Sequence, residues 1–322
     1  MVKRIFALLR RYMSSSSSVS FWHTSIDRVV YDYKSLADYY IDLSAKAEYA
    51  GPFDVNGIPL LDYTGAIGVQ YNPCACAQYA LGQFQLWKRS GNELARERFF
   101  QIADWLCQTQ ALEDAGTKGY WLYHFDLDAY EVDAPWKSGL AQAQAISVLA
   151  RAVKFAPDET RKEVYQTALD LGFAGLITSV EEGGLTLTEG EDLWVEEVVA
   201  KRRVAILDGC LFALFGVRDY ADLTGSADAE ALFESGTDTI LRYLPTFDIG
   251  YWSRADLYQE KPPMPASHFY HGLHIHQLHA MHALTKAPAF AEYAERWEKY
   301  QMSWLNRKRA LVAKIVFKIG YY

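Results

Sequence analysis

The sequence predicts a mainly α-helical fold: an incomplete (α/α) toroid of about four helical hairpins, with short β-hairpin connectors and a small N-terminal extended segment. One helix-pair pattern recurs four times. Counted between Gln78, Gln144, Gly209 and Gln277, the repeats are 66, 65 and 68 residues apart. The first helix of each pair is rich in small residues and the second is charged and amphipathic. Such a constant period is typical of repeat architectures.

Turn residues interrupt each predicted pair. The breaks fall at Ser90-Gly91, Pro157-Asp158, Thr224-Gly225-Ser226 and Ala287-Pro288. Small residues allow close helix packing, so we expect the first helices inside and the amphipathic second helices outside. The four pairs are expected over residues 72–110, 138–177, 205–244 and 267–305.

Extended connectors are predicted between the pairs. Gly-Tyr-Trp at 119–121, Gly-Gly-Leu at 183–185 and Gly-Tyr-Trp at 250–252 each introduce an extended run with turn residues, which indicates short β-hairpins. The predicted organisation is a basic tail with a Ser-rich linker over 1–20, an extended or β segment over 21–70, the helical domain over 71–306 and a basic tail over 307–322.

The composition excludes some classes of protein. The chain has 322 residues, half of them hydrophobic, and a net charge of −8, which argues against general nucleic-acid binding. Aromatic residues make up 15%, which suits either sugar-stacking surfaces or an aromatic core. The four cysteines form no Cys-x-x-Cys pair and lie among apolar residues, so we expect reduced thiols and a cytoplasmic location.

Both ends of the chain are basic and partly apolar. Met1–Met13 carries four Lys or Arg residues among Ile, Phe and Leu, and the last 16 residues have the same character. No run is long and apolar enough for a transmembrane span. The ends are therefore read either as frayed tails or as peripheral contacts with an anionic membrane surface.

Six of the eight histidines lie within residues 268–282. Tyr270, His274 and Gln277 share one helical face there with Met281. His276, His279 and His282 offer the spacing of metal ligands, but they spread over an arc and no carboxylate lies in the helix. Helix packing by hydrogen-bonded histidines is the preferred interpretation, so no metal is predicted.

A second candidate site is a carboxylate pair beside three cations. Glu196 and Glu197 follow Trp194-Val195, and Lys201, Arg202 and Arg203 come soon after. This pattern suits an acid/base pair with cations that bind an anion, or a solvated charged connector. Its position just before a predicted inner helix favours the first interpretation.

Five motifs, in order along residues 55–305, resemble the C-terminal catalytic domain of heparosan-type D-glucuronyl C5-epimerases. They are Gly57-x-Pro59-Leu60 with Tyr71-x-Pro73 and Ala77-Gln78-Tyr79; Trp136-x-Ser138-x-x-Ala141-Gln142-x-Gln144; Trp194-x-Glu196-Glu197; Tyr270-His271-x-x-His274-Ile275-x-Gln277; and Ala287-Pro288-x-Phe290 with Arg296-Trp297-x-x-Tyr300. The resemblance implies an (α/α) barrel, conversion of D-glucuronate to L-iduronate residues in an anionic polysaccharide, and often a homodimer. It implies no cofactor.

The resemblance also implies roles for individual residues. Glu197 and Tyr270 match the positions of the two acid/base groups, with Glu196 beside the first. The remaining positions are expected to bind the sugar chain or its carboxylates: Trp136, Tyr71, Gln78, Gln144, Arg202, Arg203, His271 and His274. The chain has Val198 and Ala255 where the family has tyrosines, and Tyr258 where it has an arginine, so Arg254, Tyr258 and Tyr251 are candidates to replace the missing groups.

Two alternatives remain open at this stage. A polysaccharide lyase shares the first step, proton abstraction at C5, and then expels the C4 oxygen; the missing tyrosines keep this reading open. A non-catalytic glycan-binding protein would need the aromatic and cationic residues but no acid/base pair.

Overall fold

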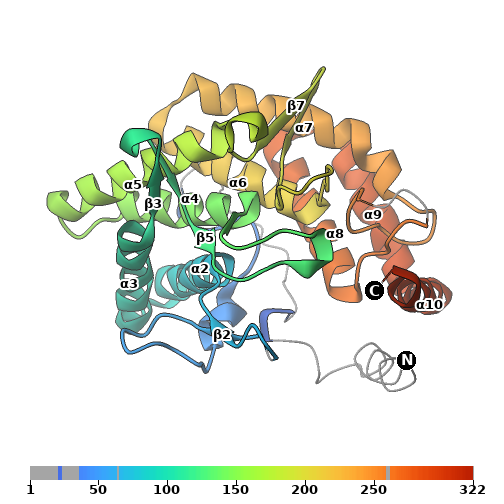
Figure 1. The fold of residues 1–322 in the computed structure, drawn as a ribbon, viewed down its shortest axis with the longest axis horizontal. Helices are drawn as coiled ribbons and strands as arrows, with labels where there is room; N and C mark the ends of the chain where they lie inside the picture. Colours follow the sequence, from blue (N-terminus) through green and yellow to red (C-terminus); the bar gives the residue numbers. More distant parts are fainter. Residues whose placement is uncertain (1–20, 24–35, 64, 259–261, 322) are drawn as a thin grey trace.

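The computed structural model describes residues 21–23, 36–63, 65–258 and 262–321. The described part is mainly helical, with few and short strands (Figure 1). Four helical hairpins follow one another, as the period predicts: α2 (Pro73–Ser90) with α3 (Glu93–Thr109), α4 (Gly139–Lys154) with α5 (Glu159–Ile177), α6 (Leu207–Thr224) with α7 (Ala227–Phe247), and α8 (His268–Thr285) with α9 (Pro288–Met302).

Local chemistry sets the helix ends. The side chains of Asn72, Ser138 and Ser267 each accept a hydrogen bond from a backbone N–H in the first turn of α2, α4 and α8. Gly91 and Gly225 end α2 and α6 in the left-handed conformation, with φ of 68° and 70°. The interruptions predicted from the sequence are therefore capped helix ends.

The small-residue helices pack against one another inside. Every residue of α4 from Ala141 to Val153 is buried, whereas α3 buries only one face. The neighbours follow chain order, with α2 against α4, α4 against α6 and α6 against α8. Gly216 allows α6 to approach α4, because a Cβ there would lie 2.8 Å from the Cβ of Ala143.

Short hairpins connect the pairs, as predicted for the first two connectors. The first contains β3 (Ala111–Glu113) with β4 (Lys118–Tyr120) and β5 (Leu122–Tyr123) with β6 (Trp136–Lys137); the second contains β7 (Thr186–Glu189) with β8 (Asp192–Val195). In the last connector the described residues form isolated bridges, Asp248 with Ser253 and Arg254 with Pro265, rather than a hairpin.

The N-terminal segment is mostly irregular where it is described. It contains the 3-10 turns η1 (Phe21–His23) and η3 (Ser44–Glu48) and a small hairpin of β1 (Leu61–Asp62) with β2 (Val69–Gln70). A buried ion pair ties it to the inner helices: Arg151 of α4 bonds Asp219 of α6 at 2.6 Å and also donates to the Asp38 carbonyl, while the Tyr40 hydroxyl donates to Asp219.

The predicted C-terminal tail is a helix. The helix α10 (Trp304–Tyr321) contains the predicted boundary at residue 307 and lies on the side of the molecule away from α3 (Figure 1). Ala310, Lys314 and Phe317 are buried at helical spacing, which explains why this end is ordered instead of frayed. The predicted tail and linker over 1–20 lie outside the described residues. No described helix combines the length and apolarity that crossing a membrane requires.

Candidate functional site

The carboxylate pair lies just after β8, between the first turns of two inner helices. The backbone of Glu196 donates to the Leu185 carbonyl at 2.9 Å and accepts from the N–H of Gly139 at 3.0 Å. Gly139 in α4 and Gly209 in α6 make room for this segment. A Cβ at Gly139 would lie 2.7 Å from a methyl group of Val195, and one at Gly209 would overlap the Glu197 carboxylate.

Glu197 is the centre of an acidic cluster. Its Oε2 atom is enclosed, and no described residue forms a hydrogen bond with it. Burial raises the pKa of Glu197 well above its usual value, and the nearby carboxyl groups of Asp208, Glu196 and Asp256 raise it further. Glu197 therefore holds its proton far more tightly than an ordinary glutamate does.

Glu196 is buried beside Glu197, but its carboxylate has stabilising partners. The N–H of Ala205 donates to its Oε2 at 3.0 Å, and the Arg203 Nε lies 3.9 Å from its Oε1. Burial raises the pKa of Glu196 to about 7 despite these stabilising partners. The two neighbouring carboxyl groups thus have different surroundings, since Glu196 is held by the backbone and Glu197 faces other acids.

Replacing Glu196 with Gln should change how stability depends on pH. The carboxyl group ionises near 4.5 in the unfolded chain and near 7 in the folded one. Between these values the folded state binds more protons, so this group lowers stability as pH rises, by roughly 3 kcal/mol above pH 7. In Glu196→Gln that decline disappears. Urea unfolding of the wild type and of Glu196→Gln at pH 5 and pH 8 measures this difference. If stability depended on pH equally in the two proteins, the raised pKa of Glu196 would be contradicted.

A chain of buried polar groups leads from the acidic cluster into α8. Asp208, in the first turn of α6, has its Oδ1 3.5 Å from the Nε2 of His274. The Nδ1 of His274 lies 2.9 Å from the Oγ of Ser253, and this Oγ lies 2.7 Å from the Nδ1 of His271. The Nε2 of His271 lies 3.1 Å from the carbonyl of Trp297. All four side chains are buried.

Hydrogen-bond chemistry fixes the proton positions along this chain. The Trp297 carbonyl can only accept, so His271 donates from Nε2, and its Nδ1 accepts from the N–H and the hydroxyl of Ser253. Burial first, and then His274, lowers the pKa of His271 to about 3, so it is neutral. The Ser253 oxygen then accepts from the Nδ1 of His274. The other ring nitrogen of His274, Nε2, is the atom that faces Asp208.

Replacing Ser253 with Ala should lower activity by positioning His274 poorly. Removal of a buried group that orients a functional histidine typically costs about 10- to 100-fold. The two ring nitrogens lose their shared partner, so we also expect the pH profile of turnover to shift. Ser253→Thr retains the hydroxyl and is the matched control. A Ser253→Ala variant with an unchanged rate and an unchanged pH profile would show that this row of buried polar groups has no role in catalysis.

Side chains from α2 and α4 complete the cluster. The Cys74 thiol donates to the Oε1 of Gln144 at 3.1 Å and lies 3.5 Å from the Nε2 of Gln78. Burial, followed by the nearby Glu197, raises the pKa of this thiol. Lys46 lies close to the same thiol, and burial lowers its pKa to about 8. Cys74 of α2 and Asp208 of α6 therefore lie near Glu197, and Gln144 of α4 is joined to the same place through Cys74.

Tyr270 lies one turn before His274 on the same face of α8, as the sequence predicts. Its hydroxyl is 3.4 Å from the Nε2 of His23, and the two rings meet edge to face. Gln277, one turn further along, donates to the Asp208 backbone carbonyl at 2.9 Å. His274 and Gln277 therefore direct this part of α8 at Asp208 of α6, while the Tyr270 hydroxyl lies beside His23.

The two predicted sugar platforms have different positions. Trp136 stacks on Tyr123, with the ring centres 4.1 Å apart. It packs in the same apolar cluster as Val198, the residue that follows Glu197 in the sequence. Tyr71 instead bonds Asp54 and lies against Trp105 of the outer helix α3. No described contact brings Tyr71 to the Glu197 cluster.

The predicted cations are also divided. Arg203 is half-buried between Glu189 and Tyr243, at 3.1 and 3.3 Å, so its contacts tie β7 to α7. Arg202 is exposed and lies over the ring of Tyr258, 4.4 Å from its centre. Arg254 is buried and donates to the Asp256 backbone carbonyl at 2.7 Å.

Asp256 organises the rim of this cluster. It accepts from the Tyr258 backbone N–H at 3.2 Å and the Tyr130 hydroxyl at 3.1 Å. Burial raises the pKa of Asp256. Tyr258 packs in the same apolar cluster as Val198, the residue that follows Glu197 in the sequence.

Two other histidines of α8 bond to α9 or to the residue just before it. His279 bonds Glu298 at 2.7 Å and His282 bonds the Ala287 carbonyl at 3.0 Å, which confirms helix packing for these two. Within the described ranges, no three His, Cys, Asp or Glu side chains converge closely enough to hold a metal ion.

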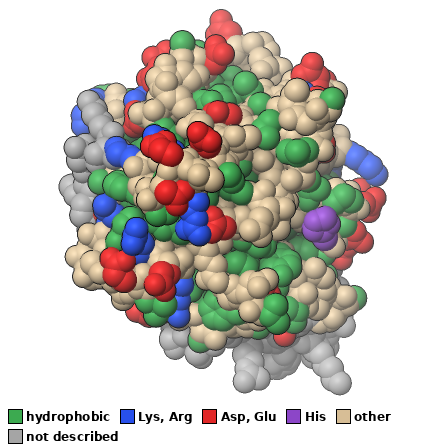
Figure 2. Space-filling view, turned by 90° about the vertical axis from the view of Figure 1, so that its left-hand side faces the viewer, with side chains coloured by type: hydrophobic (Ala, Val, Ile, Leu, Met, Phe, Trp, Pro, Cys, Tyr) green, Lys and Arg blue, Asp and Glu red, His purple; other side chains and the backbone are tan. Residues whose placement is uncertain are grey.

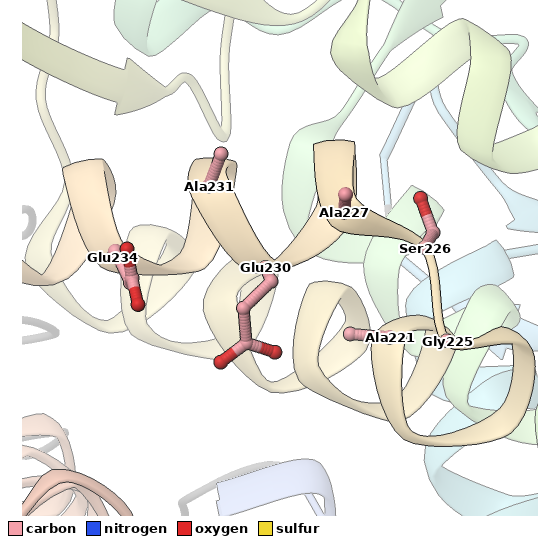
Figure 3. Close-up of a pocket in the computed structure, with 7 residues that line it drawn as sticks. All are labelled: Ala221, Gly225, Ser226, Ala227, Glu230, Ala231 and Glu234. Carbon is pink, nitrogen blue, oxygen red and sulfur yellow. The ribbon is translucent and has the colours of Figure 1, made fainter.

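Two surface hollows lie elsewhere. One, of about 420 Å³, lies where α6 turns into α7 and is lined mainly by small residues with Glu230 and Glu234 (Figure 3). The other, of about 760 Å³, runs along α3 towards Arg161 of α5, on the face where acidic and basic side chains are interspersed (Figure 2). Neither contains the Glu197 cluster, and the first would repel an anionic sugar.

Sequence reasoning missed several members of the cluster. Asp208, Ser253, Asp256, Cys74 and Lys46 contribute to it but carry no motif of their own. Asp208 offered a usable signal, since it is an acidic residue in the first turn of a helix and an apolar run from Gly209 to Val217 follows it. The other four are brought in from separate elements.

Comparisons with known proteins identify a family. Residues 114–299 match the family described as D-glucuronyl C5-epimerase C-terminus. A D-glucuronyl C5-epimerase of Caenorhabditis elegans is 26% identical over 221 residues, which cover 63% of this chain and 34% of that protein. An uncharacterized protein of Methanocaldococcus jannaschii is 26% identical over 183 residues, 56% of this chain and 57% of that one.

The match to the family spans more than half of the chain and contains most of the cluster. Glu197, Asp208, Ser253, His274 and Tyr270 all lie within residues 114–299. The chain itself spans just over half of one of these relatives and about a third of the other. On this evidence, the chain belongs to the D-glucuronyl C5-epimerase C-terminal family.

Proposed function

We propose that this protein inverts C5 of D-glucuronate residues in an anionic polysaccharide. The observation that carries the proposal is Glu197, a carboxyl group with an enclosed Oε2 atom and a raised pKa, placed beside the first turns of α4 and α6 in a chain of this family. A base that removes a proton from carbon works best when its pKa is close to the working pH. The pKa of an ordinary glutamate lies well below that, so its carboxylate is too weak a base.

The reaction removes the C5 proton from one face of the ring and returns a proton to the other. Glu197 serves one face and Tyr270 the other, each as base or acid according to direction. His274, whose Nε2 faces Asp208, adds a polar group to the surroundings in which charge develops on the sugar carboxylate. Trp136 supports the sugar ring, and Arg202 with Tyr258 lies at the rim, where a neighbouring carboxylate would bind.

We also infer that the four hairpins are arranged as an incomplete toroid. The inner helices contact one another in chain order, and their first turns carry the residues of the cluster: Cys74 in α2, Asp208 in α6 and Tyr270 in α8. This arrangement supports a site at one end of the inner ring. A solution scattering profile that fits a closed bundle better than a curved row would contradict it.

The reaction is tested by incubating the protein with heparosan in deuterated water. Deuterium at C5 together with iduronate, seen by NMR, is the expected result. Absorbance from a 4,5-unsaturated product would identify a lyase, the candidate that Val198 and Ala255 keep open. If the protein bound heparosan without exchanging the C5 proton, eliminating or inverting C5, the result would identify a non-catalytic glycan-binding protein.

A further inference from the structure

The helix α10 exposes an apolar stripe. Leu305, Val312, Val316 and Ile319 are 69%, 59%, 61% and 48% exposed. At 100° per residue they fall within one narrow arc, opposite the buried Ala310, Lys314 and Phe317. Trp304, 60% exposed, lies at the start of the helix beside this stripe. Exposed aliphatic side chains in a row are unusual on a protein surface that meets only water.

The charge of α10 is opposite to that of the rest of the chain. The helix has no Asp or Glu and carries five cations: Arg307, Lys308, Arg309, Lys314 and Lys318. The whole chain has a net charge of −8. An apolar face bordered by cations, with Trp at one end, is the composition of helices that lie in the surface of an anionic bilayer.

The helix is held firmly on the body of the protein. Lys314 donates to the Pro265 carbonyl at 2.7 Å, and Arg309 lies 3.8 Å from the centre of the Tyr251 ring. Ala310 packs with Trp252 and Ala266. These contacts fix the rotation of α10 about its own axis, so the stripe faces outward in one defined direction.

We propose that α10 docks this protein on the surface of a membrane that contains anionic lipids, with the stripe at the boundary of the acyl chains. A symmetric contact between two copies through the stripe would bring the cations of one α10 close to those of the other. Lipid phosphates and carboxylates instead neutralise them. The proposal does not depend on the catalytic assignment, because none of the stripe residues belongs to the Glu197 cluster.

Co-sedimentation of the full chain with vesicles tests the proposal. We expect binding to an equimolar mixture of phosphatidylcholine and phosphatidylserine, much weaker binding to phosphatidylcholine alone, and weakening as salt rises. Val316→Asp should reduce binding roughly tenfold or more, since it places a charge within the stripe. Lys308→Gln should reduce it roughly fivefold. The matched controls are Val164→Asp and Lys162→Gln on the exposed face of α5, which should bind as wild type does.

Two outcomes would overturn the proposal. If the α10 variants and the α5 controls bind vesicles equally, any membrane contact lies elsewhere in the chain. If sedimentation equilibrium without lipid shows a dimer that Val316→Asp dissociates, the stripe is covered by a second copy. Circular dichroism of each variant verifies that a loss of binding does not reflect unfolding.

Discussion

Glu197→Gln is expected to reduce C5 inversion at least about a hundredfold while leaving the fold intact. The amide keeps the shape of the side chain but can neither take up nor release the proton. A positioned acid or base typically contributes about 10²- to 10⁴-fold. The fold should survive, because Oε2 has no hydrogen-bond partner among the described residues and the change removes an acid from a site that already contains Asp208, Glu196 and Asp256.

Tyr270→Phe provides the complementary measurement. Inversion needs a group on each face, so the two losses should be strongly non-additive. Each single variant can still exchange the C5 proton from the face whose partner survives, without inverting the carbon. Deuterium exchange and iduronate formation are followed separately by NMR on a substrate that the wild type accepts. Near-normal inversion in both variants would transfer the acid/base role to His271, His274 or Tyr258.

Gly209→Ala is expected to lower activity by a similar factor, although it changes no functional group. A methyl group at this position in α6 would overlap the Glu197 carboxylate and lie 2.6 Å from its Cβ. The carboxylate must then move, and a displacement of about 1 Å can cost about a hundredfold in rate. Alanine is the better helix former by about 1 kcal/mol, so helix propensity alone would predict a harmless or stabilising change.

The matched control is Gly272→Ala in α8. The added methyl group would meet only the end of the flexible Gln301 side chain, at 3.1 Å. We expect Gly272→Ala to retain most of its activity, and circular dichroism to show both variants folded. A folded Gly209→Ala protein with wild-type turnover would show that the position of the Glu197 carboxylate in this structure is not the one used in catalysis.

The sequence by itself determined the helical hairpins and the face of α8. Both depend on local chemistry: the polar caps Asn72, Ser138 and Ser267 and the glycines Gly91 and Gly225 define helix ends without help from distant parts of the chain. The periodicity that places His274 and Gln277 on one face follows from helix geometry alone. The glutamate pair was found because its two members are adjacent in sequence.

Only the tertiary structure decided which side chains meet. Asp208, Ser253 and His274 come from three separate elements, and no spacing along the chain predicts their contact. Arg203 and Tyr71 were expected to bind substrate, yet the structure ties the first to Glu189 and the second to Asp54. The order of α10 likewise depends on a surface for Ala310, Lys314 and Phe317 to cover. Burial and contacts between distant residues arise from packing between elements. The residue pattern along one element predicts only its secondary structure and which side chains share a face.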